Sequence, residues 1–226
     1  LVIMRIFGYL PTMKMAILAV SVIAMILGIC MAMTQDDFKR VIAYLAVGEL
    51  GYIGVGIGLG TAYSMTAGLF QATNELVVTS MLFAAFGLVL YKTKTSKISN
   101  LGGLIEDMPA AALLTVLAGF IMAGIPPFSV FQSKYMLCQA AMAQGIPELA
   151  IIMTILSIVT FLAFLKITYM VFLRPKPAEL KVSKSKIPKV TMAVLVLFLV
   201  ISLVVGLFPG LVVDKLGLMA LATLIL

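Results

Sequence analysis

Four ionisable side chains lie inside long apolar stretches of this sequence: Glu49, Glu75, Lys134 and Lys166. A charged group at the centre of a bilayer costs about 2.5–3.5 kcal/mol on insertion scales, so such groups face protein or water and by default indicate a functional site. Burial disfavours the charged form of a carboxyl or an amine, and a nearby opposite charge restores it. The protonation of each group then depends on its neighbours, as a proton relay requires.

The segment FQATNELVVTSMLF, residues 70–83, surrounds Glu75 with further polar groups. Gln71, Glu75 and Thr79 are spaced four residues apart, so they share one face of a helix, and Asn74 lies beside them. We therefore predict a polar stripe through the middle of an apolar span, which suits a hydrated path between helices. Oxygens of Asn74, Glu75, Thr79 and Ser80 could also surround sodium, so the sequence leaves proton and sodium as alternatives.

A double proline, Pro126 and Pro127, precedes Lys134 in the segment GIPPFSVFQSK. Two missing backbone N–H donors must break or kink a helix at this point. Irregular backbone at membrane depth is tolerated where it lines a cavity or is packed in protein, and broken helices mark ion sites in transporters. The pattern favours a functional site near Lys134.

Each of these features also has a purely structural interpretation. The double proline could be a kink without function, and Lys166 could extend its amine to the membrane surface, as long basic side chains do. Glu49 and Glu75 could belong to packing ion pairs. Glu106 and Asp107 lie at a span boundary, where we expect solvated loop acids.

The stretches that hold these residues have the composition of membrane helices. Of the 226 residues, 63% are hydrophobic and 11% are charged. In soluble domains, about half of the residues are hydrophobic and about a quarter are charged. Several stretches reach the roughly 20 residues that a membrane helix needs, and they do not alternate like the strands of a membrane barrel. The sequence therefore predicts an all-α, polytopic membrane helix bundle embedded in a lipid bilayer.

We expect about seven or eight spans, one of them broken by proline. The apolar segments are 1–10, 15–33, 41–60, 65–91, 110–125, 128–144, 148–173 and 190–208, with a tail at 211–226. Polar connections follow at 34–40 and 92–109, and a strongly basic loop occupies 174–189. If the three segments between 110 and 173 each cross, the basic loop lies opposite the other connections, and the positive-inside rule gives no orientation.

The residue content excludes several other functions. The net charge of +7 is typical of basic loops beside membrane spans, and no basic surface studded with aromatic residues indicates nucleic acid. The chain has no His, and its two cysteines, Cys30 and Cys138, lie apart in apolar segments. Metal sites of Cys and His, Ser-His chemistry and iron–sulfur ligation therefore lack their residues. We expect no cofactor or metal in this chain.

Four stretches resemble, in order, the motifs of the antiporter-like membrane subunits. DDFKRVIAYLAVGELGYIGVGIGLG resembles the family's D-x-K-R-x-x-A-Y segment, and FQATNELVVTSMLFAAFG resembles its H-x-x-x-H-A-x-F-K-A segment. NLGGLIEDMP and AGIPPFSVFQSKY resemble its L-G-G-L-x-x-x-M-P and A-G-x-P-P segments. Subunits of this family occur in respiratory complex I, in Mrp-type sodium/proton antiporters and in energy-converting membrane-bound nickel–iron (NiFe) hydrogenases. The resemblance covers about residues 1–175.

The resemblance implies an axis of buried ionisable groups near the membrane midplane, with a Lys or Glu just after a broken helix. Lys134 falls on that position. Glu75 and Gln71 fall where the family often has His, Thr79 where it often has a central Lys, and Glu49 where it has His or Gln. These departures leave two hypotheses. In the first, which we favour, a proton relay runs through Glu49 and Glu75. In the second, this chain has lost proton pumping and keeps only a line of polar side chains.

The resemblance also bears on the organisation of the chain. In the family, an inverted repeat precedes the broken-helix half, whereas this chain begins near the end of that repeat's last helix. We expect 1–10 to be the end of a truncated or split helix, 15–173 the antiporter-like repeat of the C-terminal half, 174–189 a basic loop and 190–226 a last span with its tail.

The resemblance implies partners as well. Another membrane subunit would supply the missing half-channel, and a hydrophilic redox module would carry any NiFe or iron–sulfur centres. We expect an ion-translocating subunit of such a redox-driven complex in the cell (cytoplasmic) membrane of an archaeon or bacterium. An Mrp-type Na⁺/H⁺ antiporter subunit and a structural membrane-arm subunit without its own ion path remain alternatives.

Overall fold

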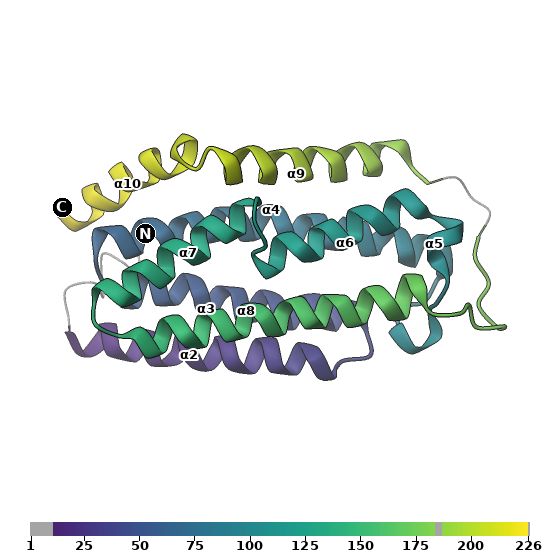
Figure 1. The fold of residues 1–226 in the computed structure, drawn as a ribbon, viewed down its shortest axis with the longest axis horizontal. Coiled ribbons are helices and arrows are strands. Elements are labelled where there is room, and N and C mark those ends of the chain that lie inside the picture. The colour runs from purple at the N-terminus through teal and green to yellow at the C-terminus, as the bar shows by residue number, and fades with distance from the viewer. Residues whose placement is uncertain (1–10, 184–186, 226) are drawn as a thin grey trace.

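The structure, a computed structural model, describes residues 11–183 and 187–225 (Figure 1). Over these ranges the chain is all-α, and the one β feature is an isolated bridge between Asp37 and Lys97. The helices are α2 (Pro11–Thr34), α3 (Phe38–Gly58), α4 (Ala62–Thr93), α5 (Leu104–Asp107), α6 (Pro109–Ala123), α7 (Ser129–Ala143), α8 (Pro147–Thr168), α9 (Lys189–Leu207) and α10 (Gly210–Ile225), with a 3-10 turn at Ile98–Asn100 and a π-helical turn at Tyr169–Leu173. The expected helix end at 1–10 lies outside the described residues.

In the described part of the chain, five helices are long and apolar enough to cross a membrane. They are Met13–Thr34, Phe38–Gly58, Ala62–Thr93, Pro147–Leu173 and Lys189–Leu207. Their outer faces are apolar and exposed, with Val20 67%, Ile151 58% and Val190 76% accessible. Water does not favour such faces, whereas lipid or neighbouring membrane helices do. The predicted all-α membrane helix bundle is confirmed.

The broken helix changes the expected number of crossings. α6 and α7 have 15 residues each and lie end to end in the bundle (Figure 1). α6 ends at Gly124, which has a φ of +78°, and α7 begins only after Pro126, Pro127 and Phe128. The segments 110–125 and 128–144 are therefore two halves of one crossing, and the described residues have fewer crossings than the seven or eight expected.

Because α6 and α7 make one crossing, three polar connections meet at one end of the bundle, at the right of Figure 1. The Ser183 amide donates to the Lys92 carbonyl (2.9 Å), and the Arg174 side chain donates to the carbonyl of Leu101 (2.8 Å). The condition under which the basic loop would lie opposite 92–109, three separate crossings between 110 and 173, is thus not met. We call this the basic end, formed by 34–40, 92–109, 174–183 and 187–189. Glu106 and Asp107 are exposed there, as expected.

Close helix contacts hold the bundle around the broken helix. A Cβ at Gly28 of α2 would lie 2.4 Å from the backbone nitrogen of Gly48 in α3, so only glycine allows this approach in lipid. On the other side, a Cβ at Gly206 of α9 would lie 2.2 Å from the carbonyl oxygen of Pro127. α9 therefore packs directly on the backbone of the break.

Candidate ion-translocation site

The site lies where α3, α4 and α7 meet beside the break. α3 begins at its N-cap Asp37 and carries Glu49, and α4 begins with a capping box between Thr61 and Ser64. The spacing of Gln71, Asn74 and Glu75 turns all three toward the interior of the bundle, and all are buried. α7 starts just after the break, which places Lys134 in its second turn.

A buried ion pair forms the centre of the site. The Lys134 ammonium lies 2.8 Å from Oε1 of Glu49, and the two side chains are 7% and 0% exposed. The other Glu49 oxygen accepts a hydrogen bond from the Gln71 amide at 2.8 Å. Both carboxylate oxygens are therefore bound, which offsets part of the cost of burying this charge.

The break supplies a further ligand for Lys134. Its ammonium donates to the Met122 carbonyl at 3.1 Å. This carbonyl lies in the last turn of α6, where backbone carbonyls have no partner within the helix. The ammonium also lies 4.5 Å from the centre of the Tyr52 ring, within cation–π range. In a continuous helix, a backbone N–H four residues later would bond the Met122 carbonyl. The double proline removes that donor, and the carbonyl accepts a hydrogen bond from Lys134 instead.

A chain of hydrogen bonds extends from the ion pair toward α9. The Ser133 hydroxyl donates to the Gln71 amide oxygen (2.5 Å). The Asn74 amide donates to the Ser133 hydroxyl (3.0 Å) and to the Ser129 carbonyl (3.1 Å). The hydroxyls of Ser129 and Ser202 lie 3.0 Å apart and both residues are buried. The polar stripe of α4 thus continues across α7 into α9.

Glu75 lies in the same region but is bound less completely. It is 8% exposed, and its Oε1 accepts a hydrogen bond from the half-buried Thr79 hydroxyl. Its Oε2 has no hydrogen-bond partner among the described residues. Ser80 is exposed on α4, away from the interior. Gln71, Asn74 and Glu75 of the stripe are buried on α4, and Glu75 has different surroundings from Glu49 on α3.

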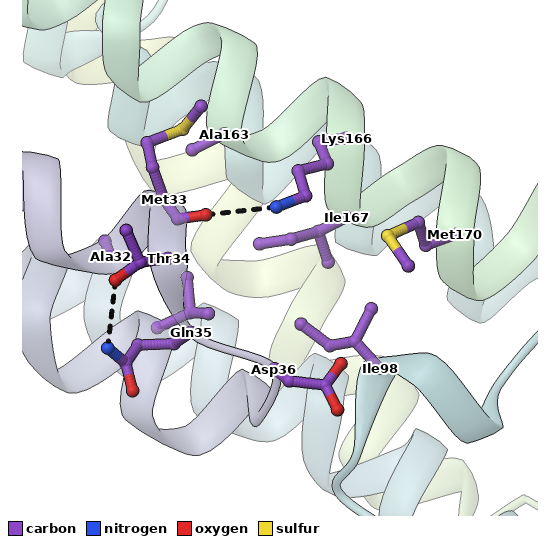
Figure 2. A pocket seen from close by; sticks show the side chains of 11 residues that line it. Ala32, Met33, Thr34, Gln35, Asp36, Ile98, Ala163, Lys166, Ile167 and Met170 are labelled. Carbon is purple, nitrogen blue, oxygen red and sulfur yellow. Dashed lines mark hydrogen bonds between the residues drawn. The ribbon is translucent and has the colours of Figure 1, made fainter.

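Lys166 is not in contact with this cluster. It is exposed on α8 and donates to the Met33 carbonyl at 3.0 Å, at the end of α2 (Figure 2). It lines a cavity of about 120 Å³ together with Gln35, Asp36 and Met170. A lysine at this place stabilises the C-terminus of α2, because its charge complements the helix dipole.

A second cavity, of about 220 Å³, touches Lys134 from the other side. It lies between α7 and α8, and its lining includes Tyr135, Cys138, Thr154 and Ser157. Lys134 thus takes part both in the ion pair with Glu49 and in the lining of this cavity.

Several groups of the site escaped prediction. Tyr52 lies beneath Lys134, and its hydroxyl donates to the Met153 carbonyl at 2.7 Å. Ser129 and Ser133 follow the double proline four residues apart, a spacing that marks one face of α7. That signal was available in the sequence. Ser202 is a serine in an apolar span, and the sequence gives no sign of its partner. Its hydrogen bond with Ser129 appears only when α7 and α9 pack together.

Among the described residues, no group of three or more His, Cys, Asp or Glu side chains is placed to hold a metal ion. Cys30 is exposed on α2 and Cys138 is half-buried on α7, and both thiols are free. The chemistry that this arrangement supports is the movement of charge between carboxylates and one ammonium.

Comparison with known proteins gives the family. A sequence model described as "NADH:quinone oxidoreductase/Mrp antiporter, TM" matches residues 1–160. The chain is 38% identical over 221 residues to an uncharacterized protein of Methanocaldococcus jannaschii, covering 96% of this chain and 46% of that protein. It is 27% identical over 209 residues to NADH-quinone oxidoreductase subunit N of Acidithiobacillus ferrooxidans, covering 90% and 42%.

A solved structure of the Mrp complex from a Dietzia species contains a chain of the same fold, with a TM-score of 0.88. That chain is 23% identical, and the match covers 97% of this chain and 49% of that one. This chain therefore spans about half the length of the proteins that it matches. The chain belongs to the NADH:quinone oxidoreductase/Mrp antiporter family of transmembrane subunits.

Proposed function

We propose that this chain is an ion-translocating subunit of a redox-driven membrane complex, of the energy-converting hydrogenase or complex I-like type. One observation carries the proposal. The fully buried carboxylate of Glu49 holds the ammonium of Lys134 at 2.8 Å, directly beside a broken helix. A buried ion pair is weak evidence for stability alone, and intramembrane charges of this kind indicate a pathway for ions.

The groups of the site have distinct roles in this proposal. Lys134 and Glu49 form the switching pair, because protonation of Glu49 would remove the charge that holds the ammonium. Gln71 and Asn74 align the pair through Ser133. Glu75, held by Thr79, is the second acid of the path. Lys166 has a lesser role at the basic end.

The organisation of the basic end supports an orientation. Connections 34–40, 92–109 and 174–189 carry most of the Lys and Arg residues, and the opposite connections carry few. Because short loops rich in Lys and Arg stay on the cytoplasmic side, we place the basic end in the cytoplasm, in the cell membrane of an archaeon or bacterium. Other membrane subunits, one with the complementary half-channel, and a hydrophilic redox module would complete the complex and carry its NiFe or iron–sulfur centres.

A second candidate function is that of an Mrp-type antiporter subunit, which would use the same residues without a redox module. The fold similarity to a chain of an Mrp complex favours it. Affinity purification of the tagged chain from native membranes in mild detergent, followed by mass spectrometry, separates the two. A hydrogenase or quinone-dehydrogenase module supports our proposal. Only Mrp-like membrane subunits would replace it with the antiporter.

Ion transport by the same complex in sealed vesicles tests the site itself. We expect Glu49→Gln and Lys134→Met to abolish transport, compared at equal amounts of assembled complex, because each removes one charge of the pair. Lys176→Gln is the matched control, since Lys176 forms an exposed ion pair with Asp107 at the basic end. Normal transport by Glu49→Gln and Lys134→Met would leave the structural membrane-arm role as the explanation.

A further inference from the structure

The two buried carboxylates of the site differ in how many of their oxygens are bound. Glu49 has both oxygens in hydrogen bonds, one to Lys134 and one to Gln71, each at 2.8 Å. Glu75 is 8% exposed, and its Oε2 has no partner in the described part of the chain. An ionised carboxylate with an unbound oxygen in a dry interior is strongly disfavoured. Glu75 therefore calls for a ligand that Glu49 does not need.

Lys134 does not supply this ligand. An ammonium has three N–H donors, and three neighbours already take them up. Two are the Glu49 carboxylate at 2.8 Å and the Met122 carbonyl at 3.1 Å. The third is the face of the Tyr52 ring, with its centre at 4.5 Å. Glu75 accordingly lies near this charge without a hydrogen bond to it.

The count of charges leads to the same result. The charged groups that act on Glu75 are Glu49 on α3 and Lys134 on α7. Two carboxylates and one ammonium leave one negative charge without compensation inside the bundle. One bound cation, either a proton or a metal ion, brings the cluster to neutrality.

The surroundings of Glu75 favour the proton over a metal ion. Hard cations in proteins gather several oxygen ligands, whereas the Thr79 hydroxyl is the one hydrogen-bond partner of Glu75 among the described residues. Both oxygens of Glu49 are taken, and Ser80 is exposed on α4. A proton needs one oxygen only, and Oε2 offers it.

We propose that Glu75 carries an exchangeable proton in the resting protein, whereas Glu49 stays ionised in its pair with Lys134. The protonated form, with its O–H on Oε2, leaves Oε1 to accept from Thr79. One chain then holds one mobile proton, and the carried ion is a proton and not sodium. The identity of the carried ion rests on the function proposed above, whereas the protonation of Glu75 does not.

Infrared difference spectroscopy of the complex purified from native membranes tests this directly, since a protonated carboxyl has its own C=O stretching band. We expect a band that disappears as the pH is raised, with the intensity of one carboxyl per chain. Glu75→Gln should remove this band. Glu148→Gln, which changes an exposed acid in the first turn of α8, should leave it in place.

Thr79→Val provides a second variant for the case that Glu75→Gln does not assemble. It keeps the carboxyl and removes one hydrogen bond to its oxygen, so we expect the same band at a higher frequency. Addition of Na⁺ at constant pH should not change the band. A band that persists in Glu75→Gln, or one that Na⁺ removes, would overturn the proposal. Loss of ion transport has no bearing on this readout, so the two proposals can fail separately.

Discussion

Removal of Lys134 should destabilise this chain far more than removal of the whole ion pair. Lys134→Met leaves the Glu49 carboxylate fully buried with the Gln71 amide as its remaining partner. Breaking one side of a buried ion pair costs about 3–5 kcal/mol, whereas replacing both charges by residues of similar volume is often neutral. We therefore expect Glu49→Gln/Lys134→Met to lie within about 1 kcal/mol of the unmodified chain, with the Gln71 contact retained.

Cys138 offers a readout for this difference within the purified complex. Its thiol is half-buried on α7 beside Lys134. The rate at which this thiol is alkylated therefore reports unfolding of the helices around it as a denaturing detergent is added. The exposed Cys30 is first replaced by Ser. At about 1.4 kcal/mol per factor of ten, the single variant should open about 10²–10⁴ times more readily.

Ion transport separates stability from function in the same variants. Lys134→Met and the double variant should both lose transport, although only the first is unstable. A single variant as stable as the unmodified chain would refute the reasoning, because Glu49 would then not depend on Lys134. A double variant as unstable as the single one would refute it equally, because volume and not charge would then be decisive.

Three further predictions concern the framework around the site. Gly206→Leu should lower ion transport and disturb assembly of the complex, seen on native gels, because a Cβ at this position would lie 2.2 Å from the Pro127 carbonyl oxygen. The control Gly87→Leu should change neither, because a Cβ at Gly87 has no atom within 4 Å. Burial opposes the charge of Asp37, but hydrogen bonds from Ser96 and from backbone amides outweigh it and hold the pKa of this carboxyl below its ordinary value. Its contribution, about 1 kcal/mol as an N-cap, should be present above the ordinary pKa and be lost as the pH falls through the lower folded-state pKa. Asp37→Asn should therefore flatten the dependence of stability on acidic pH, measured by circular dichroism of the complex. Lys176→Gln should change the free energy of unfolding by less than about 1 kcal/mol, because surface ion pairs contribute little. A larger loss would show that the basic end is more rigid than its exposure indicates.

The sequence allowed correct prediction of the all-α membrane helix bundle. Apolar runs near 20 residues predict membrane helices because unpaired backbone groups are not tolerated in lipid. The spacing of Gln71, Glu75 and Thr79, with Asn74 beside them, predicts one polar face of a helix. Gln71, Asn74 and Glu75 are buried on that face, whereas Thr79 is half-buried. Pro126 and Pro127 predict the break for the same local reason, since a missing N–H donor has its effect at its own position.

The number of crossings could not be read from the same pattern. Two apolar segments of about one span each flank the double proline, and hydropathy alone does not tell whether the chain turns back or continues. α6 and α7 continue in one direction, and the described parts of the basic loop, 174–183 and 187–189, therefore lie at the same end as the connections at 34–40 and 92–109. The direction that the chain takes after this one short break thus determines the side of the membrane on which each later connection lies.

The sequence by itself determined which groups are polar and which of them share one face of a helix, because both follow from spacing along one chain. Only the tertiary structure decided the partners. Lys134 binds Glu49, 85 positions away, together with a carbonyl at the end of α6, while Glu75 keeps one oxygen unbound. Pairing depends on how α3, α4, α6 and α7 rotate and approach one another, and these contacts are set by packing between helices and not by the pattern of any single helix.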